Sequence, residues 1–407
     1  MKVIQLNVTY GNADSTGRNV KELHNYLLAR GFDSHVYTTE INDESELDDR
    51  IHLFSSANDK RIHALFSRLT GKQGYFSYFS TKVLIAELSE LKPDVVVLHV
   101  LHSNCINLPF FVKYLSVNHI PVVLVLHDCW YFTGHCCHYS EVKCEKWKMD
   151  CQGCPQIHEW NKSWFFDTAD KCLKDKKDWI HSISKLGVIG VSNWITDEAK
   201  KSILKDADVI HRIYNWIDLE IFKPRDAKDL RKQLGISPST KVLLGVASGW
   251  SNKKGLREMF RAAQNIPDAM IIMVGDMPKG ISMPENMIAA GRITDPVKLS
   301  EFYSMADVFL NPSIQETFGK TTAEALSCGT PVIVYNTTAC TELVGDSCGK
   351  VVPNGDTSLF IQNIICQLAE NSEYVSDRCR KFAVYNFDAK ARMRDYENVL
   401  RKIVEMS

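Results

Sequence analysis

Two glutamates, Glu316 and Glu324, have seven residues between them in the segment QETFGKTTAEAL. The apolar run 306–310 before them predicts a strand, and the alanine-rich stretch after Gly319 predicts a helix. Glu316 should then lie in a loop at the carboxyl end of a strand, where open α/β sheets bind ligands. Because carboxylates accept hydrogen bonds from hydroxyl groups, this position suits a sugar.

The start of the predicted helix adds an anion site. We expect free backbone N–H groups on Lys320, Thr321 and Thr322 in its first turn. A helix N-terminus carries about +0.5 elementary charge, which favours a phosphate. Two carboxylates alone are more often a surface loop followed by a helix, but the Phe-Gly step and the strand entry CGTPVIV argue against that alternative.

The pattern E-x-F-G-x-x-x-x-E-A-L-x-C-G-T-P-V-I resembles the signature of retaining, nucleotide-sugar-dependent glycosyltransferases of family 4. The resemblance extends over nearly the whole chain. It implies the α/β GT-B fold, with two doubly wound (Rossmann-like) parallel-sheet domains facing a central cleft. It also implies metal-independent transfer from a UDP- or GDP-sugar to a glycan or lipid-linked oligosaccharide, as in bacterial capsule, exopolysaccharide or lipopolysaccharide synthesis.

The same resemblance assigns roles to residues of this segment. Glu324 would accept hydrogen bonds from the two ribose hydroxyls of the nucleotide. Glu316, together with the backbone N–H groups of Phe318 and Gly319, would hold hydroxyls of the donor sugar. Arg292, followed by Ile293, matches the position after the strand that flanks the base, where a guanidinium could stack on the base. A strand-end ion pair is an equal alternative for Arg292.

A lysine-rich loop, ASGWSNKKGL, resembles the family loop that grips the diphosphate, and Lys254 matches its lysine. A departing diphosphate accumulates negative charge, so the site needs cations that stabilise it as it forms. The family arginine five residues earlier is replaced here by Gly249. Lys253, or Arg18 in the other half of the chain, could supply that charge. A solvated turn is the alternative for the lysine pair.

The first predicted helix has a polar start, DSTGR, which we expect to face the strand-end crevice. Ser15 or Thr16 is its predicted N-cap. The helix start near Gly17, like the one near Lys320, would help to stabilise the leaving diphosphate.

His127 follows the apolar run 122–126 and resembles the family histidine that approaches the donor sugar. A lone histidine at a strand end is more often polar surface, but the matching position and the adjacent Asp128 favour a functional role. His99 and His102 end the preceding strand and are weaker candidates for contact with the acceptor.

A cysteine-rich insert at about residues 129–158 is also found in family members with this His-Asp-Cys-Trp motif. Four thiols ending in C-x-x-C suit a structural, tetrahedral zinc ion that would hold a loop over the acceptor cleft. Free buried cysteines are the alternative. The predicted ligands are Cys136, Cys144, Cys151 and Cys154. The substitutes for Cys136 are Cys137, His135 and His138.

Residues 60–82 mix basic and aromatic side chains, which together can seat a protein on an anionic lipid surface. Peripheral contact with the inner membrane face is therefore one prediction for this segment. An ordinary helical hairpin is the alternative.

Composition bounds the remaining possibilities. The 407 residues are 45% hydrophobic and 24% charged with a net charge of -1, which gives no overall attraction to nucleic acid. The first residues, MKVIQLNV, predict a strand and not a signal peptide, and the longest apolar runs are too short to span a membrane. We therefore expect a cytoplasmic protein whose 13 cysteines are free, buried or metal-bound rather than disulfide-paired.

Strand and helix patterns alternate in two series, which predicts two parallel sheets. We expect an acceptor-binding domain at 1–218, a nucleotide-sugar-binding domain at 219–388, and a C-terminal helix at 389–407 that packs back on the first domain. The strands predicted for the first series are 3–8, 35–38, 95–98 and 122–126. Those predicted for the second are 242–246, 270–274, 287–290, 308–310 and 332–334.

Two other functions fit parts of the sequence. A glycoside hydrolase could use Glu316 and Glu324 as acid and base. A non-catalytic, zinc-bearing scaffold of a polysaccharide assembly complex would be consistent with the missing arginine at Gly249.

Overall fold

The computed structural model describes residues 1–12, 14–41, 48–370 and 372–406. They form two compact units, Met1–Ile213 together with Met393–Ser407, and Tyr214–Arg392. Each unit contains its own parallel sheet with connecting helices. The predicted α/β class with two parallel sheets is therefore confirmed.

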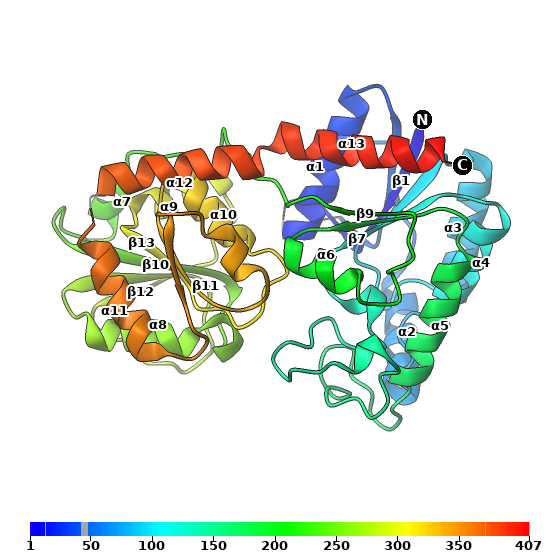
Figure 1. Ribbon diagram of the computed structural model, residues 1–407, viewed down its shortest axis with the longest axis horizontal. Coiled ribbons are helices and arrows are strands. Elements are labelled where there is room, and N and C mark those ends of the chain that lie inside the picture. The colour runs from blue at the N-terminus through cyan, green and yellow to red at the C-terminus, as the bar shows by residue number, and fades with distance from the viewer. Residues whose placement is uncertain (13, 42–47, 371, 407) are drawn as a thin grey trace. The chain divides into compact units, whose positions relative to one another are not determined.

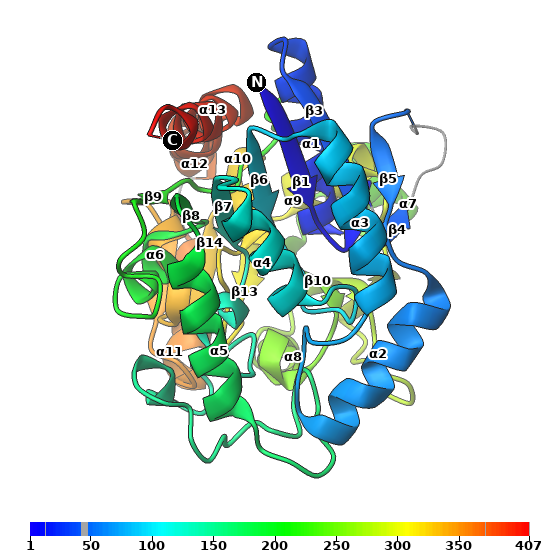
Figure 2. The same cartoon turned by 90° about the vertical axis from the view of Figure 1, so that its right-hand side faces the viewer.

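The first unit is built on a sheet of parallel strands. Its strands are β1 (Lys2–Leu6), β3 (Asp33–Thr38), β5 (Ile51–Leu53), β6 (Val95–Leu98), β7 (Val122–Leu126), β8 (Leu186–Gly190) and β9 (Val209–Arg212). Their order across the sheet is β5-β3-β1-β6-β7-β8-β9. The strand order therefore reverses between β1 and β6. Figure 1 labels β1, β7 and β9 of this sheet, and Figure 2 labels the other strands as well. A separate short pair is formed by β2 (Thr9–Tyr10) and β4 (Glu40–Ile41).

Helices connect the strands of the first unit, and α3, α4 and α5 lie side by side (Figure 2). The C-terminal helix α13 packs on α1, where the Tyr26 hydroxyl donates to Glu397 at 3.0 Å. The helices are α1 (Ser15–Ala29), α2 (Ala57–Thr70), α3 (Tyr78–Leu91), α4 (Leu108–Val117), α5 (Ala169–Ser182), α6 (Asn193–Ala199) and α13 (Ala389–Glu405). Residue 407 of the predicted terminal helix lies outside the described residues.

The second unit has the same design. Its strands are β10 (Lys241–Gly249), β11 (Ala269–Asp276), β12 (Met287–Gly291), β13 (Val308–Asn311), β14 (Val332–Tyr335) and β15 (Gly349–Val352). They are parallel and run in the order β12-β11-β10-β13-β14-β15, so the order reverses between β10 and β13. The helices are α7 (Lys228–Gln233), α8 (Leu256–Asn265), α9 (Pro296–Met305), α10 (Lys320–Ser327), α11 (Thr357–Leu368) and α12 (Ser372–Phe387).

The strands that the sequence predicted best are the ones buried on both faces. β6, β7, β13 and β14 are buried at every position, and such strands appear in a sequence as continuous apolar runs. Sequence reasoning missed β5, β9 and β15, which are only partly buried and lie at the sheet edges. It also missed β8, although this strand is buried at every position. No helix in the described part of the chain is long and apolar enough to cross a membrane.

Candidate active site

Lys254 and Glu316, predicted from separate motifs, form an ion pair in the second unit. Lys254 ends the short 3₁₀ helix Asn252–Lys254 after β10, and Glu316 follows β13. The Lys254 Nζ atom lies 2.6 Å from Glu316 Oε1. Because β10 and β13 flank the reversal of strand order, the pair occupies the carboxyl-end position where open α/β sheets bind ligands.

The ion pair keeps the lysine charged. Burial alone would lower the pKa of Lys254, but the charge of Glu316 and the hydrogen bond to it raise that pKa above its usual value. Lys254 is therefore a fixed cation at neutral pH. Such a cation can stabilise an anion that forms beside it.

Close backbone contacts hold the two loops together. Gly255 has φ +79, and a Cβ atom there would lie 2.2 Å from Cγ of Pro312. The Ile314 N–H donates to the carbonyl of Lys253 at 3.1 Å. Glycine thus follows Lys254 because any side chain would push the loops apart.

Glu316 is fixed through its own backbone. Its N–H donates to Thr338 Oγ1 at 2.9 Å, and its carbonyl accepts from the N–H of Ala339 at 3.3 Å. Both partners belong to the 3₁₀ helix Thr338–Leu343 after β14. Sequence reasoning missed this helix, because uncharged residues that act on a backbone leave no motif.

Helix α10 begins at Lys320, within the predicted range. Gly319 before it has φ +90, a left-handed conformation that favours glycine. The Thr322 N–H donates to the Gly319 carbonyl at 2.9 Å, and the Thr322 hydroxyl accepts from Asn311 Nδ2 at 2.9 Å. The N–H of Thr322 is thus used within the helix, so a phosphate would have to share it with the Gly319 carbonyl, and the role of Thr322 stays a prediction. Lys320 and Thr321 remain predicted phosphate donors.

The second carboxylate, Glu324, is almost buried inside α10, with 5% of its surface exposed. Its Oε2 atom accepts a hydrogen bond of 2.9 Å from the hydroxyl of Tyr303 on α9. Tyr303 therefore orients the carboxylate, a role that the sequence did not reveal. Binding of the ribose by Glu324 stays a prediction.

The side chain of Phe318 is part of the core. Its ring centroid lies 5.7 Å from those of Tyr214 and Phe387. Only the backbone of Phe318 can therefore serve the predicted contact with the donor sugar. The aromatic ring instead fixes the loop between Glu316 and α10.

The other predicted donor residues of the second unit lie at the ends of neighbouring strands. Arg292 and Ile293 directly follow β12, and Lys253 precedes Lys254 in the 3₁₀ helix. Gly249 ends β10, and no atom lies within 4 Å of the place of a Cβ there. The structure therefore leaves room for the arginine that the family loop carries at this position.

Gly17 and Arg18 lie in the first turn of α1, in the first unit. The N-cap is Asp14 and not the predicted Ser15 or Thr16, because its carboxylate reaches the Gly17 N–H at 2.8 Å. This N–H already has an anionic partner. The predicted phosphate contact of Gly17 would therefore require Asp14 to move.

Two of the predicted histidines meet at the reversal of strand order in the first unit. His99 follows β6, and its Nδ1 atom lies 3.1 Å from Nε2 of His127, which follows β7. The other nitrogen of His99 lies 3.2 Å from Oε1 of Gln5 on β1. Burial lowers the pKa of His99, so this imidazole is neutral and can orient the ring of His127.

The four cysteines predicted as zinc ligands lie in the insert. Burial and, to a smaller extent, the neighbouring thiols of the set raise the pKa of Cys136 and of Cys151 to about 12. The set is therefore clustered. No three of its sulfur atoms lie within 4.8 Å of one another, whereas tetrahedral zinc needs separations of about 3.8 Å. The predicted ligand set of Cys136, Cys144, Cys151 and Cys154 is not assembled in this structure, and zinc there stays a prediction.

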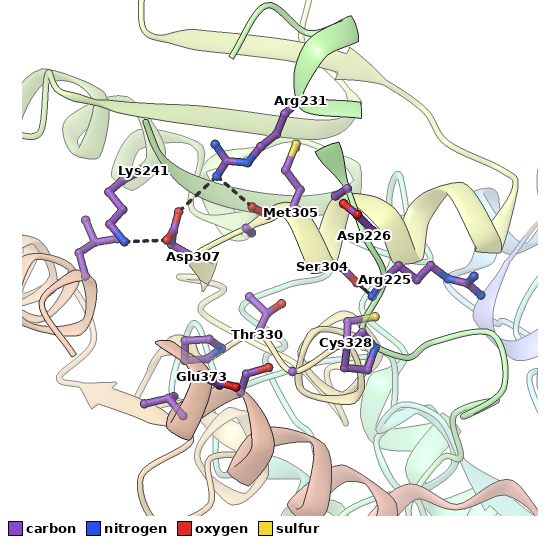
Figure 3. Close-up of a pocket in the computed structure, with 18 of the residues that line it drawn as sticks. Arg225, Asp226, Arg231, Lys241, Ser304, Met305, Asp307, Cys328, Thr330 and Glu373 are labelled. Carbon is purple, nitrogen blue, oxygen red and sulfur yellow. Dashed lines mark hydrogen bonds and ion pairs between the residues drawn. The ribbon is translucent and has the colours of Figure 1, made fainter. Parts of the chain in front are cut away.

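The second unit also has a cavity of about 440 Å³ away from this crevice (Figure 3). Lys241 Nζ lies 2.9 Å from Asp307 Oδ1, and Arg231 Nη2 lies 3.7 Å from Asp307 Oδ2. Lys241 begins β10 and Asp307 precedes β13, so the cavity lies at the amino edge of the sheet. Its charged groups stabilise the strand starts, and it is not the predicted donor site.

Comparison with known proteins shows the family. Residues 16–221, just over half of the chain, match the model of glycosyltransferase family 4, and residues 240–370 match glycosyl transferases group 1. The chain belongs to glycosyltransferase family 4.

Curated relatives are bacterial enzymes. A putative colanic acid biosynthesis glycosyl transferase, WcaC of Escherichia coli K12, is 25% identical over 89% of this chain and 90% of that protein. The N-acetyl-alpha-D-glucosaminyl L-malate synthase of Bacillus anthracis is 27% identical over 52% of this chain, and the match spans only 58% of that enzyme.

Solved structures show the same fold. Sucrose-phosphate synthase of Thermosynechococcus elongatus aligns over 100% of both chains with a TM-score of 0.74 at 18% identity. Anabaena Alr3699/HepE in complex with UDP-glucose aligns over 99% of this chain and 100% of its own, with a TM-score of 0.67 at 16% identity. The predicted GT-B fold is confirmed.

Proposed function

We propose that the protein is a retaining, metal-independent glycosyltransferase that moves a sugar from a nucleotide sugar to a hydroxyl of a glycan or lipid-linked oligosaccharide. The observation that carries this proposal is the Lys254–Glu316 ion pair at the reversal of strand order, beside the start of α10. A cation, a carboxylate and a helix N-terminus at one sheet edge match the phosphate and hydroxyl groups of a sugar diphosphate.

In this mechanism Lys254 turns from Glu316 toward the diphosphate when the donor binds. The bond between the anomeric carbon and the phosphate oxygen breaks, and Lys254 stabilises the charge that gathers on the diphosphate. Glu316, held by Thr338, accepts a hydrogen bond from a hydroxyl of the sugar. The acceptor oxygen bonds to the same face of the sugar, and its proton passes to the leaving phosphate oxygen.

UDP is our first candidate for the nucleotide, because Anabaena Alr3699/HepE was solved with UDP-glucose; GDP is the second. A thermal-shift screen of UDP, GDP, ADP and their sugars tests this point. A ligand present at about 100 times its Kd would add about 2.7 kcal/mol to the free energy of unfolding. Such a change would appear as a clear rise in Tm.

The best donor is then incubated with the protein, and release of free nucleotide is measured with and without added glycans. Donor turnover supports the transferase. The alternative of a non-catalytic scaffold is favoured if no nucleotide raises the Tm and no donor is consumed.

We place the reaction in bacterial capsule, exopolysaccharide or lipopolysaccharide synthesis because WcaC, the relative matched over most of its length, is named for colanic acid biosynthesis. Candidate acceptors are therefore glycans and lipid-linked oligosaccharides from such polymers. Mass spectrometry of acceptor mixtures after reaction identifies the one that gains a sugar. No gain with any of them, while donor is still consumed, would contradict this placement.

Exposed apolar and basic side chains of the first unit support peripheral membrane contact. Phe79 on α3 is 80% exposed, and Phe165 is 71% exposed. The segment 164–166 lies against the end of α2, because the Trp164 N–H donates to the Arg68 carbonyl at 2.7 Å. Other exposed apolar residues of α2, α3 and the segment 164–166 are Ile62, Leu65, Phe66, Tyr78, Val83, Trp164 and Phe166. The basic residues in and between the two helices are Arg61, Arg68, Lys72 and Lys82.

Sedimentation with vesicles tests this contact. We expect binding to vesicles that contain anionic phospholipid, weaker binding to neutral ones, and loss of binding in Phe79→Ser with Phe165→Ser. Tyr385→Ser is the matched control, because Tyr385 is an equally exposed aromatic residue in the second unit. Equal binding of all variants would remove the proposed surface.

A further inference from the structure

Three side chains of different chemistry converge at the carboxyl edge of the sheet in the first unit. His102 lies in the loop after β6, Asp128 lies two residues after β7, and Cys137 belongs to the insert. Their ligand atoms all lie within 4.8 Å of one another. Within the described ranges, no other group of three histidine, cysteine or acidic side chains meets this condition.

We propose that His102, Asp128 and Cys137 bind one zinc ion, whose fourth position takes a water molecule. Zinc accepts imidazole nitrogen, carboxylate oxygen and thiolate sulfur, and three protein ligands with one open position is a common zinc arrangement. This site is distinct from the four-cysteine set predicted from the insert and from the residues proposed to transfer the sugar.

The distances suit such an ion. In a tetrahedral zinc site, nitrogen and sulfur ligands lie about 3.6 Å apart, and nitrogen and oxygen ligands about 3.4 Å apart. Here Nε2 of His102 lies 3.7 Å from Sγ of Cys137 and 2.7 Å from Oδ2 of Asp128. The sulfur is already in place. The imidazole and the carboxylate would have to separate by about 0.7 Å, from 2.7 to about 3.4 Å, as the ion replaces the proton between them.

A second contact holds the carboxylate of Asp128, and hydrogen bonds to the backbone carbonyls hold the chain at Cys137 and His102. The other oxygen of Asp128 accepts from the Trp130 N–H at 2.8 Å. The carbonyl of Cys137 accepts from the Cys129 N–H at 2.8 Å, which ties the insert to the residue after Asp128. The carbonyl of His102 accepts a hydrogen bond from the side-chain amide of Gln73.

The three ligands are mostly buried, but two of them remain partly exposed to solvent. The side chains of His102 and Asp128 are 20% and 16% exposed, and Cys137 is buried. An ion can therefore enter from the side of His102 and Asp128. Once bound, it would cross-link the loop after β6, the loop after β7 and the insert.

Cobalt substitution tests the site directly. Metal is removed from the protein with a chelator, Co²⁺ is titrated in, and the thiolate-to-cobalt absorption and the visible bands of tetrahedral cobalt are recorded. Zn²⁺ is then added in competition. We expect one equivalent with one thiolate ligand, and a Cys137→Ser variant that lacks the thiolate band.

Matched variants separate this site from its alternatives. Cys137→Ser and His102→Gln should each weaken Zn²⁺ binding by more than the about 10- to 100-fold that loss of an outer-shell partner costs. Cys366→Ser, which removes an exposed thiol of the second unit, should bind like the unchanged protein. Cys151→Ser with Cys154→Ser should keep the band assigned to Cys137.

Two results would overturn the proposal. One is the absence of a thiolate–cobalt band in the unchanged protein. The other is a band that persists in Cys137→Ser but disappears when Cys151 and Cys154 are replaced. If Cys137→Ser does not fold, the His102→Gln variant decides, because an unchanged Zn²⁺ affinity there contradicts the site.

Discussion

The two units place their polar groups at the same point of the same architecture, yet the chemistry differs. In the second unit, the reversal of strand order holds Lys254 and Glu316, a charged pair. In the first unit, it holds His99 and Gln5, joined to His127 on the next strand. The fold thus supplies a position, and the loop residues determine whether that position suits an anion or a neutral hydroxyl.

The way the loops are held also differs. In the second unit, a left-handed glycine and backbone hydrogen bonds fix the loops, as Gly255 against Pro312 shows. In the first unit, hydrogen bonds between side chains connect the loops, from Gln5 through His99 to His127. Replacing one side chain of the site should therefore change mainly the local charge in the second unit. In the first unit, it should change mainly the orientation of the neighbouring side chains.

The largest effect should come from Lys254→Ala. Loss of the cation beside the leaving diphosphate should lower kcat of donor turnover by about 10²- to 10³-fold. Lys241→Ala is the matched control, since it removes the same charge from the other end of β10. The assignment fails if both variants turn over the donor equally fast.

Glu324→Gln should weaken nucleotide binding by about 1.5–3 kcal/mol, or roughly ten- to a hundredfold, because the amide replaces a charged acceptor of ribose hydroxyls. Isothermal titration with the nucleotide measures this. Tyr303→Phe should also weaken nucleotide binding, but by less, because it removes only the hydrogen bond that orients the carboxylate of Glu324. An unchanged Kd in Glu324→Gln would mean that the ribose lies elsewhere.

The units should also respond differently to acid. Burial raises the pKa of Glu397, but hydrogen bonds from Arg401, Arg30 and Tyr26 outweigh it and lower that pKa below its usual value of 4.5. The carboxylate therefore stabilises the first unit above that value, and this contribution is lost as pH falls through the lowered pKa. Glu397→Gln should cost about 1–2 kcal/mol at pH 7 and less than that at pH 3.

In the second unit, Arg380 also joins several segments through side-chain hydrogen bonds. Its acceptors are backbone carbonyls, which do not titrate. Its three partners are the carbonyls of Leu219, Phe222 and Ser327. Arg380→Met should therefore destabilise by a similar amount at both pH values. Thermal unfolding of the two variants at pH 7 and pH 3 checks the contrast, which disappears if both lose stability in parallel.

His127→Ala should lower kcat by about three- to tenfold, the value of one neutral hydrogen bond, and leave the nucleotide Kd unchanged. Gln5→Leu should act in the same way but more weakly, through His99. The measurement is a steady-state kcat together with a nucleotide titration. Weaker nucleotide binding in His127→Ala would contradict the assignment of nucleotide binding to the second unit alone.

The smallest expected effect is a gain. Gly249→Arg should tighten binding of the nucleoside diphosphate by about 0.5–1 kcal/mol, or two- to fivefold, because the position is open and lies on the lysine loop. Gly249→Glu, with the opposite charge, should weaken it. Equal affinities in the two variants would show that the diphosphate lies out of reach of Gly249.

The sequence predicted best what is local along the chain. β6 and β7 appear as apolar runs, and α10 begins where the Phe-Gly step predicts it. The N-cap of α1 was misplaced, because Asp14, Ser15 and Thr16 can all cap a helix and only the backbone path selects one. The sequence also could not show that the N–H of Thr322 contacts the Gly319 carbonyl in the first turn of α10.

The sequence alone determined the α/β class, the two sheets and the motif from Glu316 to Glu324, because apolar periodicity and helix starts depend on neighbouring residues. Only the tertiary structure decided which groups meet. Lys254 and Glu316 are 62 positions apart, His99 and His127 are 28 apart, and His102 and Cys137 are 35 apart. Such pairs form because parallel strands bring the ends of distant segments to one edge of a sheet, and no local pattern records which ends those are.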